Sequence, residues 1–297
     1  MRASAVVRSF PRGLPFLERE RHIYETRLQL LRGQFAEVLR GTEVQHQIAG
    51  SVESKRMTSY RAWALLETNQ PEAAAQLLEA LIAQYAGRGE AAQTPGLEYF
   101  YYFLARIQFE AQGTDPELRK RAVQNLRESL KLRAGCARAN ERLAFYLGMD
   151  TGTLLAGPSL FDQDVTGERR KFRDLKRALY HVLSAIRLYE GKIGAPVGVT
   201  LEELTRLKPV RNAVLLGTVS LILVRMRVFY LADRILREAV DIDPKNPSLY
   251  YTRALMAQET GQREQATAAR RRCGLLLKPW ESLLRQRSEC MLEVLSE

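Results

Sequence analysis

The side chains that carry out most protein chemistry are few in this sequence and stand far apart. Its three histidines and three cysteines are His22, His46, Cys136, His181, Cys273 and Cys290. No two of them have the short spacing of a zinc site or a redox dithiol. The sequence also lacks a phosphate-binding GxxxxGKS or GxxxxGKT loop and the HExxH and GxSxG motifs of hydrolases. These absences favour a protein that is not an enzyme and needs neither a metal ion nor another cofactor.

Two short segments have some of the features of a ligand site. The stretch from Gly191 to Gly194 is rich in glycine, but it follows a predicted helix, and the remaining phosphate-loop residues are absent. Asp162 and Asp164 could offer two carboxylates to a cation, but the later ligands and the glycine of a calcium loop do not follow them. We interpret the first segment as a linker and expect no metal site at the second.

The chain carries a large excess of positive charge. Its 45 lysines and arginines exceed its 34 aspartates and glutamates by 11, and its isoelectric point is near 9.7. Such a charge attracts acidic partners, which include nucleic acid, anionic lipid and acidic protein surfaces. The odd number of scattered cysteines argues against a disulfide framework, so we expect a reducing compartment such as the cytoplasm.

No segment of the sequence predicts export or a membrane span. The apolar stretch near the N-terminus is too short for a secretory signal, and residues 1–17 are instead expected to form a flexible basic arm. The longest apolar run, residues 213–224, is shorter than the roughly 20 residues that cross a bilayer. We expect that run to be a buried helix.

Two basic segments could bind nucleic acid. Lys120, Arg127 and Lys131 share one face of a predicted helix, because they lie seven and four residues apart. A second segment, residues 168–177, contributes Arg169, Arg170, Lys171 and Arg173. These residues define an alternative function as a helical-repeat RNA-binding protein, whose affinity would fall steeply with salt. The competing interpretation is that both segments are solvated helix faces without a ligand.

Small residues recur with a fixed period in the C-terminal part of the sequence. Ala232 and Ala266 are 34 residues apart, as are Ala239 and Cys273. Residues 213–279 are therefore predicted to form two consecutive helical hairpins, the first of which ends in a turn at Pro244. A period of this size indicates stacked hairpins, none of which can bury its apolar face alone.

This pattern resembles the tetratricopeptide repeat. The match lies in the first unit, at Ala232, Leu236, Ala239 and Pro244. The second unit departs from the family's preference for large apolar residues at Arg253 and Arg270. The resemblance implies an all-α, right-handed solenoid of stacked antiparallel hairpins. It also implies a non-enzymatic scaffold or adaptor that binds a peptide or helix of a partner protein, for which the basic charge suggests acidic groups.

The rest of the sequence extends this architecture. Residues 18–190 are expected to form degenerate hairpins with an insertion at 149–167, followed by a linker at 191–212. Residues 280–297 are expected to form a helix that caps the last repeat through Trp280, Leu283, Leu284 and Met291. An aromatic cluster opens the third hairpin, and three of its members share one side of the predicted helix: Tyr99, Tyr102 and Phe103. That side is expected to be either core or contact surface.

The resemblance also selects candidate contact residues, since the first helix of each repeat lines the inner groove. In the last two hairpins it places an apolar stripe there, which suits an amphipathic helix or an extended peptide. The predicted partner-binding residues are Val224, Arg225, Tyr251, Leu255 and Gln258. The alternative is that residues 149–167 or 191–209 fold over this stripe and bury it.

Overall fold

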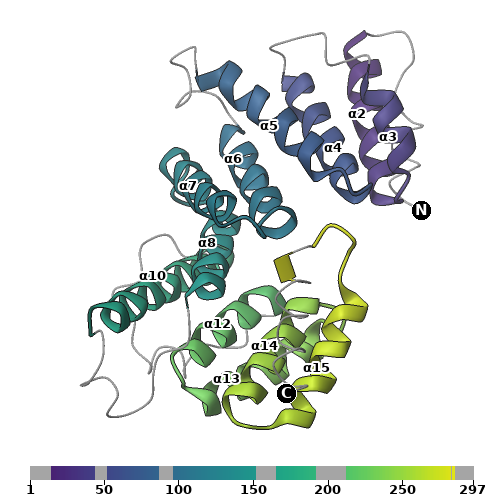
Figure 1. Cartoon of the computed structure of the whole chain (residues 1–297). Coiled ribbons are helices and arrows are strands. Elements are labelled where there is room, and N and C mark those ends of the chain that lie inside the picture. Colours follow the sequence, from purple (N-terminus) through teal and green to yellow (C-terminus); the bar gives the residue numbers. More distant parts are fainter. Residues whose placement is uncertain are drawn as a thin grey trace.

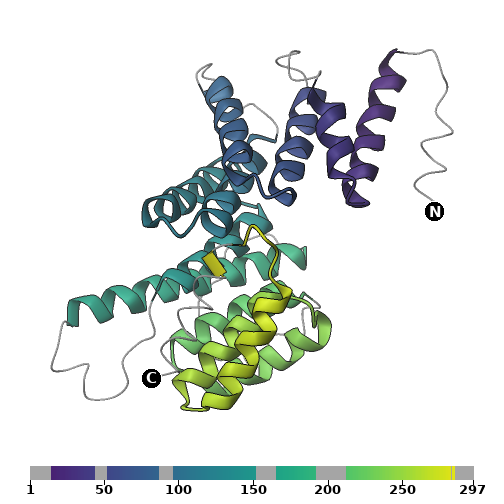
Figure 2. The same cartoon turned by 45° about the vertical axis from the view of Figure 1, so that its right-hand side comes forward.

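The computed structural model describes residues 15–43, 52–86, 96–151, 165–191, 212–281 and 283–284 (Figures 1 and 2). Within these ranges the chain forms 12 α-helices and one short π-helix, and it contains no strand. The prediction of an all-α fold is confirmed. None of the helices in these ranges is long and apolar enough to cross a membrane.

The N-terminal part consists of two helical hairpins. Its helices are α2 (Pro15–Leu31), α3 (Phe35–Glu43), α4 (Val52–Glu67) and α5 (Pro71–Ala86). Gly33, with φ of 74°, supplies the left-handed residue that ends α2, as its place in the sequence suggests. Because α2 begins at Pro15, the last residues of the predicted flexible arm are helical, and residues 1–14 lie outside the described ranges.

The middle part contains the third and fourth hairpins. Its elements are α6 (Leu97–Arg106), the π-helix η3 (Ile107–Ala111), α7 (Pro116–Leu132), α8 (Ala137–Asp150) and α10 (Val165–Tyr189). Helix α6 packs against α7, and α8 packs against α10. The predicted insertion is shorter than expected, because α8 continues to Asp150 and α10 begins at Val165. The rest of that insertion, with Asp162 and Asp164, lies outside the described residues, as does the linker between Gly191 and Asn212.

The C-terminal part forms the two hairpins that the 34-residue period predicts. Its helices are α12 (Ala213–Arg225), α13 (Phe229–Ile242), α14 (Pro247–Glu259) and α15 (Arg263–Leu276). The four small residues of that period, Ala232, Ala239, Ala266 and Cys273, are all 0% exposed. Arg270 is also buried, at 1% exposed, and it donates a hydrogen bond from Nη2 to Gln258 Oε1 at 2.8 Å. Arg270, where the tetratricopeptide pattern prefers a large apolar residue, is thus accommodated by a hydrogen bond to Gln258 in the same hairpin.

Helix α12 is the centre of the main core. It contacts α8, α10, α13 and α14, and every residue from Leu215 to Val224 is buried. Two glycines allow the close approach of its neighbours. A Cβ atom on Gly217 would lie 2.4 Å from Leu249 Cδ2, and one on Gly148 would lie 3.3 Å from Ile222 Cγ1. A helix that is apolar on all sides needs such complete cover.

The C-terminal segment differs from the predicted capping helix. We call residues 277–281 together with Leu283 and Leu284 the strap; it leaves α15 and returns toward α4 and α6 (Figure 1, yellow). Trp280 lies in a turn and is buried in the cluster of α4, α5, α6 and η3 side chains, while Lys278 Nζ lies 2.6 Å from Glu67 Oε1 at the end of α4. Leu283 and Leu284 are buried in the main core. The predicted capping helix therefore does not begin at Trp280, and its residues 285–297 lie outside the described ranges.

The surface of α15 gives the physical reason for this difference. Its buried residues are Ala266, Ala269, Arg270 and Cys273, and they form a single face that packs on α14. The outer side of α15 carries exposed charged residues such as Arg271 and Arg272, so it offers no second apolar face for a helix to cover. The large apolar side chains of the strap are buried elsewhere, on helices distant in sequence.

Replacing Trp280 with alanine is expected to lower the free energy of unfolding by about 3 kcal/mol, because the lost indole leaves a cavity between the strap and the N-terminal cluster. Urea denaturation followed by circular dichroism measures this change. Leu275→Ala on α15 is the control, since Leu275 is 79% exposed and its loss should change stability by less than about 0.5 kcal/mol. Equal stabilities of the two variants would contradict the docking of the strap.

Candidate functional site

The predicted partner-binding residues do not form an open surface. Val224 is 0% exposed, Tyr251 3% and Leu255 5%, so their selection as contact residues is wrong. The stripe is covered by helices that stand next to α12 and α14 in the fold. Arg225 is half-buried at the end of α12, and Gln258 is half-buried and accepts the hydrogen bond from Arg270.

An open groove lies instead between the first helices of the earlier hairpins. We call it the aromatic groove; its volume is about 470 Å³, and α4, α6, α8, α10 and α12 supply its walls. Its aromatic lining consists of Tyr60, Trp63, Tyr99, Tyr102, Phe103 and Tyr189. Trp63, Tyr99 and Tyr189 are 46%, 43% and 48% exposed, which is unusual for such large rings.

Helical spacing explains why these rings meet. Tyr99, Tyr102 and Phe103 lie on one side of α6, as their spacing predicts, and Phe100 on another side is buried in the core. Trp63 projects from α4, and its ring centroid lies 6.4 Å from that of Phe103, with the planes tilted by 58°. The sequence therefore contained a signal for half of this lining, while the facing wall of α8 and α10 is set by the fold.

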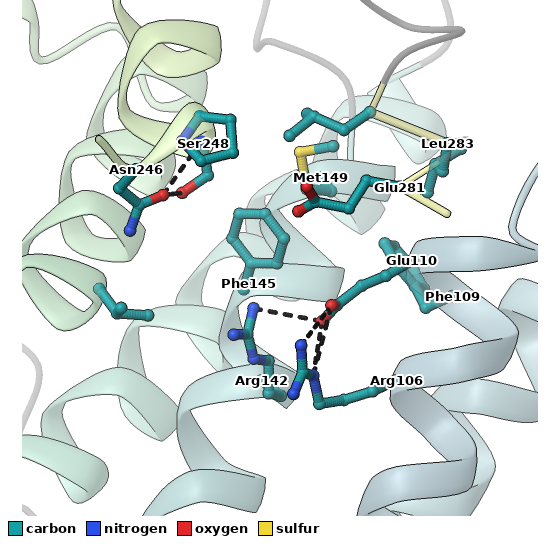
Figure 3. A pocket seen from close by; sticks show the side chains of 13 residues that line it. Arg106, Phe109, Glu110, Arg142, Phe145, Met149, Asn246, Ser248, Glu281 and Leu283 are labelled. Atoms are coloured by element: carbon teal, nitrogen blue, oxygen red, sulfur yellow. Dashed lines mark hydrogen bonds and ion pairs between the residues drawn. The ribbon is translucent and has the colours of Figure 1, made fainter. Parts of the chain in front are cut away.

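A buried carboxylate, Glu110, lies beside the groove and joins η3 to α8 (Figure 3). It accepts a hydrogen bond from Arg106 Nη2 at 2.9 Å and another from Tyr146 Oη at 2.9 Å, and Arg142 Nη1 lies 3.3 Å away. The ring of Phe109 stacks on that of Tyr146 at a centroid distance of 3.7 Å. Residues 107–111 form the π-helix, a local widening that is often found at functional sites.

In the cluster of Glu110, Arg106 and Arg142, the two positive charges outnumber the one negative charge. Burial by itself would raise the pKa of Glu110, but Arg106, Arg142 and the hydrogen bonds from Arg106 and Tyr146 lower it to about 2. Glu110 is therefore ionised at neutral pH, and two guanidinium groups share its single negative charge. Arg106 and Arg142 also line the aromatic groove, so its floor carries an excess of positive charge.

A second carboxylate in the groove is only partly satisfied. The side chain of Glu141 is 7% exposed, and its Oε2 atom lies 3.5 Å from Arg142 Nε. Its Oε1 atom is buried and has no hydrogen-bond partner among the described residues. Burial raises the pKa of Glu141, and Arg142 opposes this rise. A buried acceptor without a donor is rare, because its desolvation is not compensated.

A smaller cavity of about 100 Å³ lies beneath the strap (Figure 3). Arg106, Arg142 and Val214 line both this cavity and the aromatic groove. The strap adds Glu281 and Leu283, and the start of α14 adds Asn246 and Ser248. Asn246 caps that helix, since its Oδ1 atom accepts a hydrogen bond from the Ser248 backbone N–H at 3.1 Å. The strap therefore closes the space where the groove would otherwise continue toward α14.

The structure separates the residues of the alternative nucleic-acid set. Three of them form close ion pairs along their own helices: Lys120 with Glu117, Lys131 with Glu128, and Lys171 with Glu168. The other four, Arg127, Arg169, Arg170 and Arg173, are exposed. None of these four forms an ion pair with another residue in the described part of the chain. None of the seven lies in the aromatic groove.

The groove brings together side chains that can recognise a ligand. Among the described residues, no group of three or more His, Cys, Asp or Glu side chains could hold a metal ion. No protein-family model matches this chain, and no curated protein matches its sequence significantly. The groove itself, with exposed aromatic rings, spare arginine charge and an unsatisfied carboxylate oxygen, is suited to binding a polar and aromatic ligand.

Glu110→Gln is expected to lower the free energy of unfolding at pH 7 by about 3 kcal/mol, since it leaves two buried guanidinium groups without their anion. Because the folded-state pKa is lowered to about 2, the stabilisation by Glu110 is complete above the unfolded value of 4.5 and disappears as pH falls toward 2. Urea denaturation at several pH values measures the difference between variant and wild type.

The control for this change is Glu128→Gln, which removes a carboxylate from the exposed pair with Lys131. It should change stability by less than about 0.5 kcal/mol at any of these pH values. A stability difference between wild type and Glu110→Gln that persists unchanged below pH 3 would show that the carboxylate charge is not the cause.

Proposed function

We propose that this protein is a non-enzymatic scaffold of the tetratricopeptide kind, whose hairpins stack into a right-handed solenoid and whose aromatic groove binds a segment of a partner protein. The helices that line the groove support this function, because most of them are first helices of their hairpins. Helices α4, α6, α8 and α12 are the first helices of successive hairpins, and each contributes side chains to the groove. First helices line the concave side of such solenoids, on which partners bind.

The main support for this proposal is that the groove of the free protein contains exposed aromatic rings and a buried acceptor without a donor. Three large rings are nearly half exposed, and the buried Oε1 atom of Glu141 beside them lacks a donor among the described residues. Exposed aromatic surface of this kind typically marks an interaction site. A ligand that stacks on the rings and donates a hydrogen bond to Glu141 would cover the exposed aromatic surface and satisfy the buried acceptor.

The chemistry of the groove selects an extended peptide with an acidic side chain. A helix keeps most of its backbone N–H groups in internal hydrogen bonds, whereas an extended segment has N–H groups free to reach Glu141. Three arginines line the groove, Arg106, Arg138 and Arg142, and they outnumber the two carboxylates near them, Glu141 in the lining and Glu110 beside it. An acidic residue of the partner would balance this excess and help to fix the register of the peptide.

We place the protein in the cytoplasm. Cys136 and Cys273 are buried free thiols, and a thiol is maintained most readily in a reducing compartment. Cys136 also directly precedes α8 and packs in the main core, so its oxidation would disturb the wall of the groove. A cytoplasmic location agrees with the proposed role as an adaptor for other proteins.

Alanine at Trp63 or Tyr99 is expected to weaken binding of the partner peptide at least tenfold, about 1.4 kcal/mol, because aromatic anchors dominate such interfaces. The partner is first captured by photo-crosslinking from benzoylphenylalanine placed at position 99, and its crosslinked segment is synthesised. Fluorescence polarisation then measures the affinity of that peptide for wild type and for each alanine variant.

The matched control uses the exposed ring of Tyr230 on α13, which is 86% exposed and lies outside the groove. Benzoylphenylalanine at position 230 should not capture the same partner, and Tyr230→Ala should leave the affinity within about twofold of wild type. Equal capture from both positions, or unchanged affinity in Trp63→Ala and Tyr99→Ala proteins of normal helicity, would refute binding in the groove.

Glu141→Leu is expected to have opposite effects on stability and on binding. Removing a buried and partly unsatisfied carboxylate should leave the melting temperature unchanged or raise it, because burial disfavours the charged form. The same change removes the acceptor for the peptide and should weaken its binding about tenfold or more. Thermal melts and fluorescence polarisation on one preparation measure both quantities. A large fall in melting temperature would show that Glu141 is a structural residue.

A further inference from the structure

A second surface, on α10, has a different chemistry from the groove. We call its exposed residues the basic stripe: Arg169, Phe172, Arg173, Lys176, Arg177 and Tyr180. Arg169, Arg173, Lys176 and Tyr180 follow one another at intervals of three or four residues, so they lie along one side of the helix over about 16 Å. The opposite side of α10 is buried in the main core through Leu175, Ala178, Leu179 and Val182.

The positive charge of the stripe is only partly compensated within the described chain. Arg177 lies 3.6 Å from Asp174, but Arg169, Arg173 and Lys176 form no ion pair with another described residue. Like charges four residues apart destabilise a helix, so Arg169, Arg173 and Arg177 are held together against their mutual repulsion. The buried apolar side of α10 provides the stability that this arrangement requires.

The end of this surface is anchored on α8 through His181. His181, next to Tyr180, is mostly buried, and burial together with Arg127 of α7 and Arg177 lowers its pKa to about 4. The Nδ1 atom of His181 on α10 lies 2.9 Å from Asn140 Oδ1 on α8, and this contact holds the imidazole between α8 and α10.

Two aromatic rings lie among these cations. Phe172 is 45% exposed and Tyr180 is 39% exposed, and Lys176 Nζ lies 5.6 Å from the centroid of the Phe172 ring. Exposed rings beside a line of cations are the elements that bind a single nucleic-acid strand, since phosphates pair with the cations and bases stack on the rings. Attachment to a lipid surface would need a wide exposed apolar face, and that face of α10 is already buried.

We propose that the basic stripe binds single-stranded nucleic acid. The four cations on α10 contact successive phosphates, while Tyr180 and Phe172 stack on bases. Four phosphate contacts give a slope of about −3 in a plot of log affinity against log salt concentration. The stripe lies apart from the aromatic groove, so this binding does not depend on the proposed capture of a peptide.

The test uses the full chain and a fluorescein-labelled oligouridylate of about 16 nucleotides, with polarisation measured between about 50 and 200 mM KCl. Arg173→Gln/Lys176→Gln should weaken binding at least tenfold at low salt and reduce the steepness of the salt dependence by about 1.4. Tyr180→Leu should weaken binding about tenfold at all these salt concentrations, because it removes a stacking ring without changing the charge.

The matched control is Lys120→Gln/Lys131→Gln, which removes the same charge from the ion-paired positions of α7. Its affinity should remain within about twofold of wild type. Equal losses in the two double variants would overturn the proposal, since they would reflect net charge alone. No binding of the oligouridylate by wild type at low salt would also overturn it. Sedimentation with phosphatidylserine vesicles in place of oligouridylate binding would reassign the stripe to a membrane.

Discussion

The middle of this molecule depends on the ion pairs that the buried carboxylate of Glu110 forms with Arg106 and Arg142. Its charge is shared by Arg106 and Arg142 and its lone pairs also accept the Tyr146 hydroxyl, so η3 and α8 cannot separate without leaving buried charges uncompensated. The same two arginines form the floor of the aromatic groove and part of the wall of the cavity under the strap. One ion cluster therefore positions both concave surfaces.

The strap joins the side-chain cluster of α4, α5, α6 and η3 to the main core. Glu67 at the end of α4 accepts a hydrogen bond from Trp63 Nε1 at 3.2 Å and another from Lys278 Nζ at 2.6 Å. A ring of the groove and the strap thus share one carboxylate, although 211 residues separate Glu67 from Lys278. Trp280 and Leu283 then bury the strap in two different core clusters. This closure keeps the C-terminal hairpins next to the groove.

Helix α10 shows how one element can serve two chemically distinct surfaces. Its C-terminal residue Tyr189 lines the aromatic groove, while its N-terminal half carries the basic stripe. The apolar side between them is fixed against α8 and α12. A peptide in the groove and a polyanion on the stripe would therefore contact different faces of a rigid helix. Their proposed binding rests on separate contacts, namely ring stacking with hydrogen bonding in the groove and phosphate pairing on the stripe.

The amino-acid sequence by itself determined the helices, their turns and the depth of the small residues, because these follow from local periodicity and capping. Ala232, Ala239, Ala266 and Cys273 are buried where their period predicts, and Tyr99, Tyr102 and Phe103 share a side of α6. Only the tertiary structure decided which helix faces stay open. Val224 and Tyr251 are covered, Glu110 meets Arg142, and the strap docks on α4, since each of these outcomes depends on neighbours far away in the chain.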